Sequence, residues 1–184
     1  MAFSVTDFKQ KGISKGGARS ALFSVSLRFP SKVSATNLNT EFLIKGASIP
    51  AYSIGTYDVF YHGKAIKIAG DHNYDTWETT IINDQDFAIR KALEQWMDLI
   101  SNRQLNTRNK EVMTDGAVQT GYKKNLKVTQ FQSNGEEVPH HYHIRNAFPT
   151  NLSAIALDWA SADIEEYTCT WTFDSWHTEE QHGG

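Results

Sequence analysis

The histidines near position 140 come closer to a metal-binding motif than any other residues of this chain. His140, His141 and His143 lie in the segment HHYH. In an extended strand His141 and His143 point to the same face. Zinc usually takes three or four protein ligands, so further ligands would have to come from elsewhere in the chain. HHYH is not a known metal signature, and we interpret it as the polar face of a strand. A metal- or ligand-binding β module that uses these histidines is the alternative from a different class of function.

The other candidates for chemistry are one cysteine and a glycine-rich segment. Cys169 alternates with Tyr167 and Trp171 on one face of a predicted strand. Free cysteines in such apolar surroundings are mostly inert. The segment GISKGGAR (12–19) lacks the spacing of a phosphate-binding loop and follows no predicted strand. We therefore predict that the chain is not an enzyme and that it has no catalytic residue, cofactor or bound metal.

Composition and charge narrow the possible functions further. The 184 residues, 40% hydrophobic and 21% charged, are typical of one globular domain with one core. A net charge of -3 gives no basic surface for tight binding of nucleic acid. We expect no membrane span, because no stretch approaches the roughly 18 apolar residues that a span needs. The N-terminus also lacks the apolar core of a secretory signal. A lone cysteine favours a reducing compartment.

Residue periodicity predicts a mainly β chain with one helix. Alternating apolar residues or β-rich composition predict strands over 22–29, 41–45, 58–61, 65–69, 77–82, 126–132, 138–146 and 166–173. Turn sequences between neighbouring strands predict two hairpins, one formed by 58–61 and 65–69 and the other by 126–132 and 138–146. The segment 46–55 is predicted to be a turn or an irregular edge.

The predicted helix begins after Asn83 or Asp84, either of which can cap it. Apolar residues then recur at helical spacing from Ile89 to Ile100. We expect the helix to pack on antiparallel sheets. The predicted organisation is a flexible N-terminal arm (1–20), a single domain (21–176) with a polar loop (103–122), and a C-terminal tail (177–184).

A series of segments resembles the tail tube proteins of contractile-tailed bacteriophages. The segments are GGARSALFSVSLRFP, KGASIP, YDVFYHGKAIKIAGD, WETTIINDQDFAIRKALEQWM, RNAFPTNLSAIALDW and DIEEYTCTWTFDSW. Each is a short pattern, and their order and spacing together carry the resemblance, which runs from about 19 to 176. The stretches 103–122 and 177–184 match least. The candidate core and fold residues within the matching segments are Pro50, Trp77, Trp96, Pro149 and Trp171.

The resemblance implies a fold of packed antiparallel sheets, related to the β-barrel tubes of type VI secretion, with one flanking helix. It implies a structural virion protein whose hexameric rings stack into the hollow inner tube of the tail, inside a contractile sheath. Phage DNA is ejected through such a tube. The implied partners are further copies of the chain, the tail sheath protein, the baseplate initiator, the tail terminator, the tape-measure protein and, transiently, DNA. No membrane partner is implied. The implied location is the virion tail, assembled in the host cytoplasm. A baseplate tube initiator and the tube subunit of a DNA-free injection particle are alternatives within the same architecture.

A conduit should not bind what it conducts, so its lumen should be polar and neutral to acidic. The strand face formed by Glu166, Thr168, Thr170 and Thr172 is our candidate lumen surface, because its reverse is apolar. The face that carries His141, His143 and Arg145 suits an interface or the outside of a tube. The N-terminal arm and the polar loop are candidates for contacts between rings.

Overall fold

The computed structural model describes residues 4–13, 17–35, 38–108, 121–132 and 137–179. Its strands are β1 (Phe23–Ser26), β2 (Ile44–Ala47), β3 (Tyr52–Tyr61), β4 (Lys64–Tyr74), β5 (Trp77–Ile82), β6 (Ser101–Asn102), β7 (Thr107–Arg108), β8 (Lys124–Phe131), β9 (Glu137–Leu152), β10 (Glu166–Thr172) and β11 (Ser175–Glu179). Its helices are α1 (Val5–Asp7), which a π-helical turn (Phe8–Gly12) continues, α2 (Thr40–Leu43) and α3 (Ala88–Ile100). The predicted fold class, mainly antiparallel β with a flanking helix, is confirmed. Over the described ranges, no helix is long and apolar enough to span a membrane.

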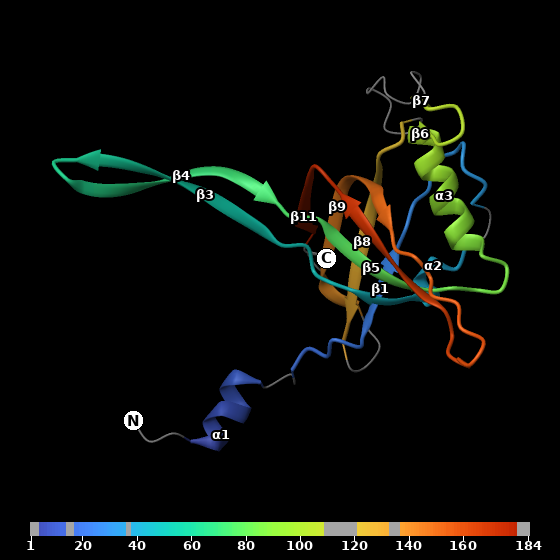
Figure 1. Ribbon diagram of the computed structural model, residues 1–184. Helices are drawn as coiled ribbons and strands as arrows, with labels where there is room; N and C mark the ends of the chain where they lie inside the picture. Colours follow the sequence, from blue (N-terminus) through green and yellow to red (C-terminus); the bar gives the residue numbers. More distant parts are fainter. Residues whose placement is uncertain (1–3, 14–16, 36–37, 109–120, 133–136, 180–184) are drawn as a thin grey trace.

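The long strand β9 joins two groups of strands into one sheet of order β1-β8-β9-β10-β5-β2 (Figure 1). The first part of β9 pairs with β8 and with β11, and its end pairs with β10. Asn146 stands where the partners change and has a left-handed backbone, with φ 57°. Asparagine tolerates this conformation better than most residues. Its amide N–H donates to Asn125 and its side chain donates to Asp174, which fixes the bend between the two parts.

The core is built around Trp171, which has no exposed surface. Its ring packs on Trp96 of α3 at 5.6 Å and on Trp77 of β5 at 6.3 Å between ring centroids. Each of these indoles donates a hydrogen bond: Trp171 to the Thr79 hydroxyl at 3.0 Å, Trp96 to the Tyr122 carbonyl at 2.7 Å, and Trp77 to the Ser48 carbonyl at 2.6 Å. Buried N–H groups need such partners, so the three rings determine how α3, β5 and β10 lie together.

Helix α3 confirms the predicted helix. Its buried residues are Ile89, Ala92, Leu93 and Trp96, which recur at helical spacing. The helix begins later than predicted, at Ala88, and its N-cap position is Phe87. The side chain of Asp84 still accepts a hydrogen bond from the backbone N–H of Ala88 at 2.9 Å and so satisfies one donor of the first turn. The buried stripe fixes α3 against one face of the sheet (Figure 1).

The prediction of a strand over 41–45 was wrong at its start. The short helix α2 occupies Thr40–Leu43, and β2 begins only at Ile44. In a continuous strand Phe42 and Ile44 would share a face, but Phe42 is 82% exposed and Ile44 is buried. The chain therefore needs an extended conformation only from Ile44, where β2 pairs with β5.

The β3–β4 hairpin is longer than predicted, because strand structure begins at Tyr52 and ends at Tyr74. The region predicted as an irregular edge is therefore partly strand. The hairpin projects from the sheet (Figure 1), so both of its faces are exposed and burial does not alternate along its strands. Strand β11 was also missed: Thr178 pairs with Tyr142 within a segment predicted to be a tail. The predicted polar loop contains the short strand β7, while 109–120 lie outside the described residues.

Replacing Trp171 with phenylalanine should lower the free energy of unfolding by about 2–4 kcal/mol, because it leaves a void and removes the hydrogen bond to Thr79. Urea denaturation of the unassembled subunit measures this change. Trp176→Phe, at the half-buried edge of the same core, is the matched control and should cost less. An equal loss in both variants would contradict the central role of Trp171.

Candidate functional site

The β3–β4 hairpin carries an apolar face that the described part of the chain leaves exposed. Tyr57 pairs with Ile68, and Val59 pairs with Ile66. These four side chains are 48–58% exposed. A two-stranded ribbon in water is at best marginally stable, and exposed apolar strands with free edges tend to pair with other chains. This face is therefore suited to contact with another protein surface.

The hairpin is held in one shape by its turn, a close contact and its base. His62 and Gly63 both have positive φ angles, 46° and 78°, as a tight two-residue hairpin turn requires. A side chain at Gly70 would meet the Tyr57 ring at 2.5 Å, so any larger residue there would displace the ring from its present position. At the base, the Tyr52 ring packs on Trp176 at 5.5 Å between centroids. The ribbon is thus joined to the core and presented as a formed surface.

The strand β10 has one apolar and one polar face, as predicted. Tyr167, Cys169 and Trp171 are buried toward α3, while Glu166 is exposed and the three threonines are half-buried. The polar face continues on β5, where Thr80 stands opposite Thr168 and Glu78 stands opposite Thr170. We call this surface the polar face: Glu166, Thr168, Thr170 and Thr172 of β10 with Glu78, Thr80 and Ile82 of β5. Helix α3 covers the opposite side of the same strands.

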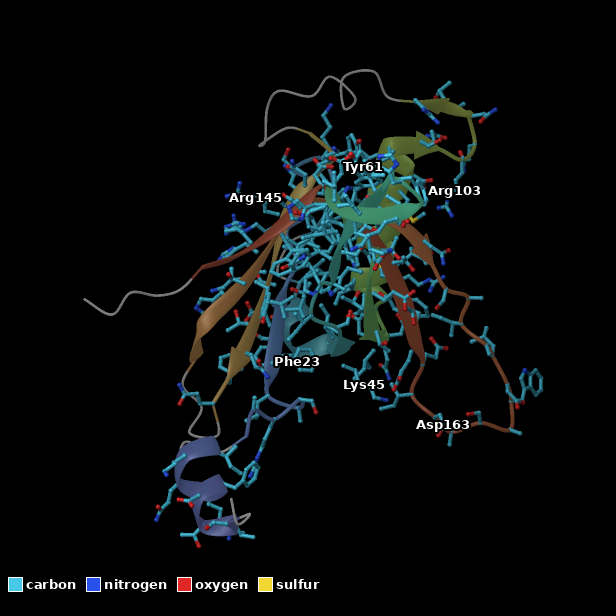
Figure 2. All side chains as sticks on the ribbon, turned by 90° about the vertical axis from the view of Figure 1, so that its left-hand side faces the viewer. Phe23, Lys45, Tyr61, Arg103, Arg145 and Asp163 are labelled. Atoms are coloured by element: carbon cyan, nitrogen blue, oxygen red, sulfur yellow. The ribbon has the colours of Figure 1, made fainter. Side chains whose placement is uncertain are left out.

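The basic side chain of Lys45 reaches the polar face. Lys45 of β2 forms an ion pair with Glu166 at 2.5 Å between Nζ and Oε1, across the intervening strand β5. Figure 2 shows Lys45 and Arg145 well apart, so the basic residue at the bend of β9 does not belong to this region. The polar face therefore consists mainly of threonine hydroxyls, the Lys45–Glu166 ion pair and the carboxylate of Glu78.

The predicted fold residues are all buried. Trp77, Trp96 and Trp171 form the core described above, and Pro50 and Pro149 are buried as well. Pro149 pairs with Trp171 across the β9–β10 ladder.

The histidines do not form a metal site in the described part of the chain. His141 is 2% exposed, and the His143 ring stacks on His177 of β11 at 5.1 Å between centroids. The side chain of His140 lies outside the described residues. Among those that are described, no three His, Cys, Asp or Glu residues are placed to share a metal ion. The rings of His143 and His177 instead stack between β9 and β11.

Neither Cys169 nor Tyr167 is arranged for nucleophilic chemistry. Burial raises the pKa of the Cys169 thiol well above its ordinary value, and burial likewise raises the pKa of Tyr167. Both effects favour the uncharged, unreactive form at neutral pH. The Arg90 guanidinium lies 5.0 Å from the centre of the Tyr167 ring, a contact that joins α3 to β10.

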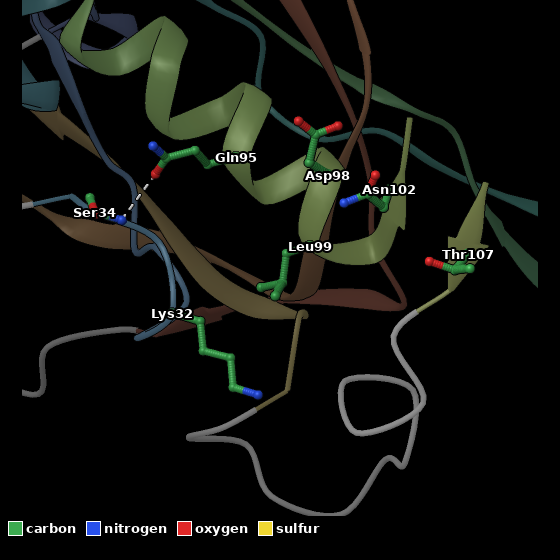
Figure 3. A pocket seen from close by; sticks show the side chains of 7 residues that line it. All are labelled: Lys32, Ser34, Gln95, Asp98, Leu99, Asn102 and Thr107. Atoms are coloured by element: carbon green, nitrogen blue, oxygen red, sulfur yellow. Dashed lines mark hydrogen bonds between the residues drawn. The ribbon is translucent and has the colours of Figure 1, made fainter. Parts of the chain in front are cut away.

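A hollow of about 600 Å³ lies beside the C-terminal end of α3 (Figure 3). Gln95, Asp98, Leu99 and Asn102 line one side of it. The amide N–H of Ser34 donates to Gln95 at 3.1 Å within it. The Asp98 carboxylate is paired with Arg103 at 2.7 Å, a contact that lowers the pKa of Asp98. The hollow is polar and lies apart from both the hairpin and the polar face.

Comparisons with known proteins agree on one family. The family model of phage tail tube proteins matches residues 18–179. The tail tube protein gp19 of Enterobacteria phage T4 is 27% identical over 149 residues, which cover 80% of this chain and 87% of gp19. The corresponding protein of phage T6 matches with the same identity and coverage.

Solved structures show the same fold. The tube-terminating cap of the anti-feeding prophage superposes with a TM-score of 0.63 at 19% identity, covering 89% of this chain and 91% of that one. The extended sheath–tube complex of the extracellular contractile injection system PVC gives a TM-score of 0.54 at 18% identity, covering 97% of this chain and 99% of that one.

Thiol labelling tests whether Cys169 is buried in the folded chain. The folded chain should react with a thiol reagent at pH 8 at least about 100-fold more slowly than the chain in urea, because the thiol becomes accessible only on opening of the core. Ala160→Cys, which adds an exposed thiol, is the positive control. Rapid labelling of the unaltered folded chain would show that Cys169 is accessible.

Proposed function

The chain belongs to the phage tail tube protein family and has a structural role in the phage tail, and from this premise we propose how its copies build a tube. Subunits form hexameric rings, the rings stack into the hollow inner tube within a contractile sheath, and DNA is ejected through the lumen. The observation that carries the proposal is the β3–β4 hairpin, whose exposed apolar face is suited to cover by a second copy of the chain.

The strands beside the polar face fit the wall of such a tube. The end of β9 with β10, β5 and β2 supplies four adjacent strands per subunit. Six subunits would supply about 24 strands, which at about 4.8 Å spacing and about 40° tilt close into a barrel with a backbone diameter of about 48 Å. That diameter leaves room for a duplex after side chains are added. Closure would also pair the outer edge of β2 with a neighbour, which removes a free sheet edge.

The polar face is proposed as the lumen and α3 as the outward side. Duplex DNA carries dense negative charge, and a wall of hydroxyls and carboxylates offers its phosphates no excess of positive charge. The four predicted lumen residues, Glu166, Thr168, Thr170 and Thr172, all lie on this face. Because α3 covers the reverse of the same strands, its exposed side would face the sheath.

Contacts between rings are proposed for the N-terminal arm (1–20) and the polar loop (103–122), which flank or interrupt the proposed single domain (21–176). Figure 1 shows α1 apart from the sheet, and Val5 and Phe8 are 59% and 54% exposed. An arm with exposed apolar residues gains stability by docking on a neighbour.

The same proposal implies which other tail components the subunit contacts. A tube subunit would contact the sheath, the baseplate initiator, the tail terminator and the tape-measure protein, with assembly in the host cytoplasm. Among its relatives of similar fold are a tube-terminating cap and a sheath–tube complex, which supports the sheath and terminator as partners. A tube initiator and a DNA-free particle remain the alternatives within this architecture, and the match to phage tail tube proteins favours the DNA conduit.

The hairpin proposal predicts that the double variant Val59→Thr with Ile66→Thr raises the critical concentration for tube assembly by about tenfold, because it removes apolar surface from the contact. Light scattering and electron microscopy of the purified protein measure the effect. Asp58→Asn with Lys67→Gln removes the exposed ion pair on the other face of the hairpin and is the matched control. Tubes of unchanged length and critical concentration in the Thr variant would contradict the proposal.

The lumen proposal predicts that Glu166→Lys leaves tube assembly intact and impairs DNA ejection, because a ring of lysines would hold phosphates by counterion release. Electron microscopy checks assembly, and the rate of DNA release from particles that carry the variant checks ejection. Normal ejection through such tubes would place Glu166 elsewhere.

A further inference from the structure

Lys45 is the only basic residue in the four strand segments that border the proposed lumen. These are β2, β5, β10 and the end of β9 (148–152), with the sequences IKGA, WETTII, EYTCTWT and FPTNL. Their acidic residues are Glu78 and Glu166. The wall as a whole is therefore neutral to acidic, but it contains one cation that could bind a phosphate.

The position of Lys45 results from an irregularity in β2. The β2–β5 ladder shifts register between Ile44, which pairs with Ile81, and Gly46, which pairs with Thr80. Lys45 falls within this shift. Glu166 stands opposite Ile82 of β5, so the lysine and glutamate side chains extend toward each other over β5 and meet. The second acidic residue, Glu78, stands opposite Thr170, farther along the ladder.

Stability does not explain this ion pair. The side chains of Lys45 and Glu166 are 57% and 35% exposed, and solvated ion pairs of this kind contribute little to folding. The ion pair does, however, change the charge that a nearby phosphate meets. A carboxylate in contact with the ammonium opposes its attraction for a passing phosphate. At physiological salt, where charges are screened over about 8 Å, little of the remaining field of the pair reaches the lumen.

We propose that Glu166 acts as a charge mask for Lys45 and thereby keeps the tube wall from binding the DNA that it conducts. The inference rests on the proposed lumen and assigns Glu166 a specific task there. The Glu166 carboxylate is required to neutralise the Lys45 ammonium beside it. It is not required because the wall must carry a negative charge at that point. The ligand that would be held without the mask is the phosphate backbone of duplex DNA.

The test compares the unaltered chain with Glu166→Gln and with the double variant Lys45→Gln/Glu166→Gln. Assembled tubes are loaded with a short fluorescent duplex, and its retention is measured between 50 and 200 mM salt. Glu166→Gln should retain more DNA, and each added phosphate contact should make retention about threefold more sensitive to this change in salt. The double variant should lose the added retention and the added salt dependence.

A matched control separates the mask from the general effect of removing a negative charge. Asp98→Asn changes the net charge by the same amount as Glu166→Gln and leaves Arg103 without its carboxylate partner, but it does so on α3. Retention in this variant should equal that of the unaltered chain. An equal increase in Asp98→Asn and Glu166→Gln would overturn the proposal.

Two further results would also overturn it. One is unchanged retention in Glu166→Gln tubes, and the other is a double variant that retains as much DNA as Glu166→Gln. The same chains are also compared as unassembled subunits by fluorescence anisotropy with the duplex at 50 mM salt, where the same order of affinity is expected. Electron microscopy of the tubes distinguishes failure of the proposed function from failure of the charge-mask proposal. Failure of the unaltered chain to form hollow tubes would contradict the proposed function, whereas intact tubes with unchanged retention would contradict the mask alone.

Discussion

The buried indole N–H groups impose the constraint on which the rest of the structure depends. Trp77, Trp96 and Trp171 are almost completely buried, and each must keep a hydrogen-bond acceptor while its ring packs in the core. The acceptors come from different parts of the chain: the Ser48 carbonyl before β3, the Tyr122 carbonyl before β8 and the Thr79 hydroxyl of β5. Satisfying all three at once places the helix on one side of β10 and leaves the other side of that strand to solvent or to a lumen.

This arrangement gives the two faces of β10 different roles. Side chains alternate along a strand, so a shift by one residue would exchange the apolar and polar faces. The tryptophan contacts fix the register, and the polar face is a consequence of that register. The proposed conduit therefore owes its smooth wall to core packing on the reverse of the same strand.

Features that depend on a local repeat could be predicted from the sequence. The stripe from Ile89 to Ile100 predicted α3, and strict alternation from Glu166 to Phe173 predicted β10 and its polar face. The limits of the β3–β4 hairpin could not be predicted because both of its faces are exposed. Strand β11 follows β10 after a short turn, in a segment whose polar ending resembles a tail. The ion pair between Lys45 and Glu166 joins residues 121 positions apart across a shift in register, and no local pattern indicates it.

The continuity of β9 has a mechanical consequence. In the proposed tube, any load along the axis or in torsion would pass between the group of strands that contains β8 and β11 and the group that contains β10. In this chain the continuous backbone of β9, through Asn146, joins the two strand groups in addition to the side-chain contacts of their shared core. Peptide bonds do not slip under shear as packed surfaces do. In the proposed tube, we expect a subunit built this way to keep its two strand groups aligned while the surrounding sheath changes length.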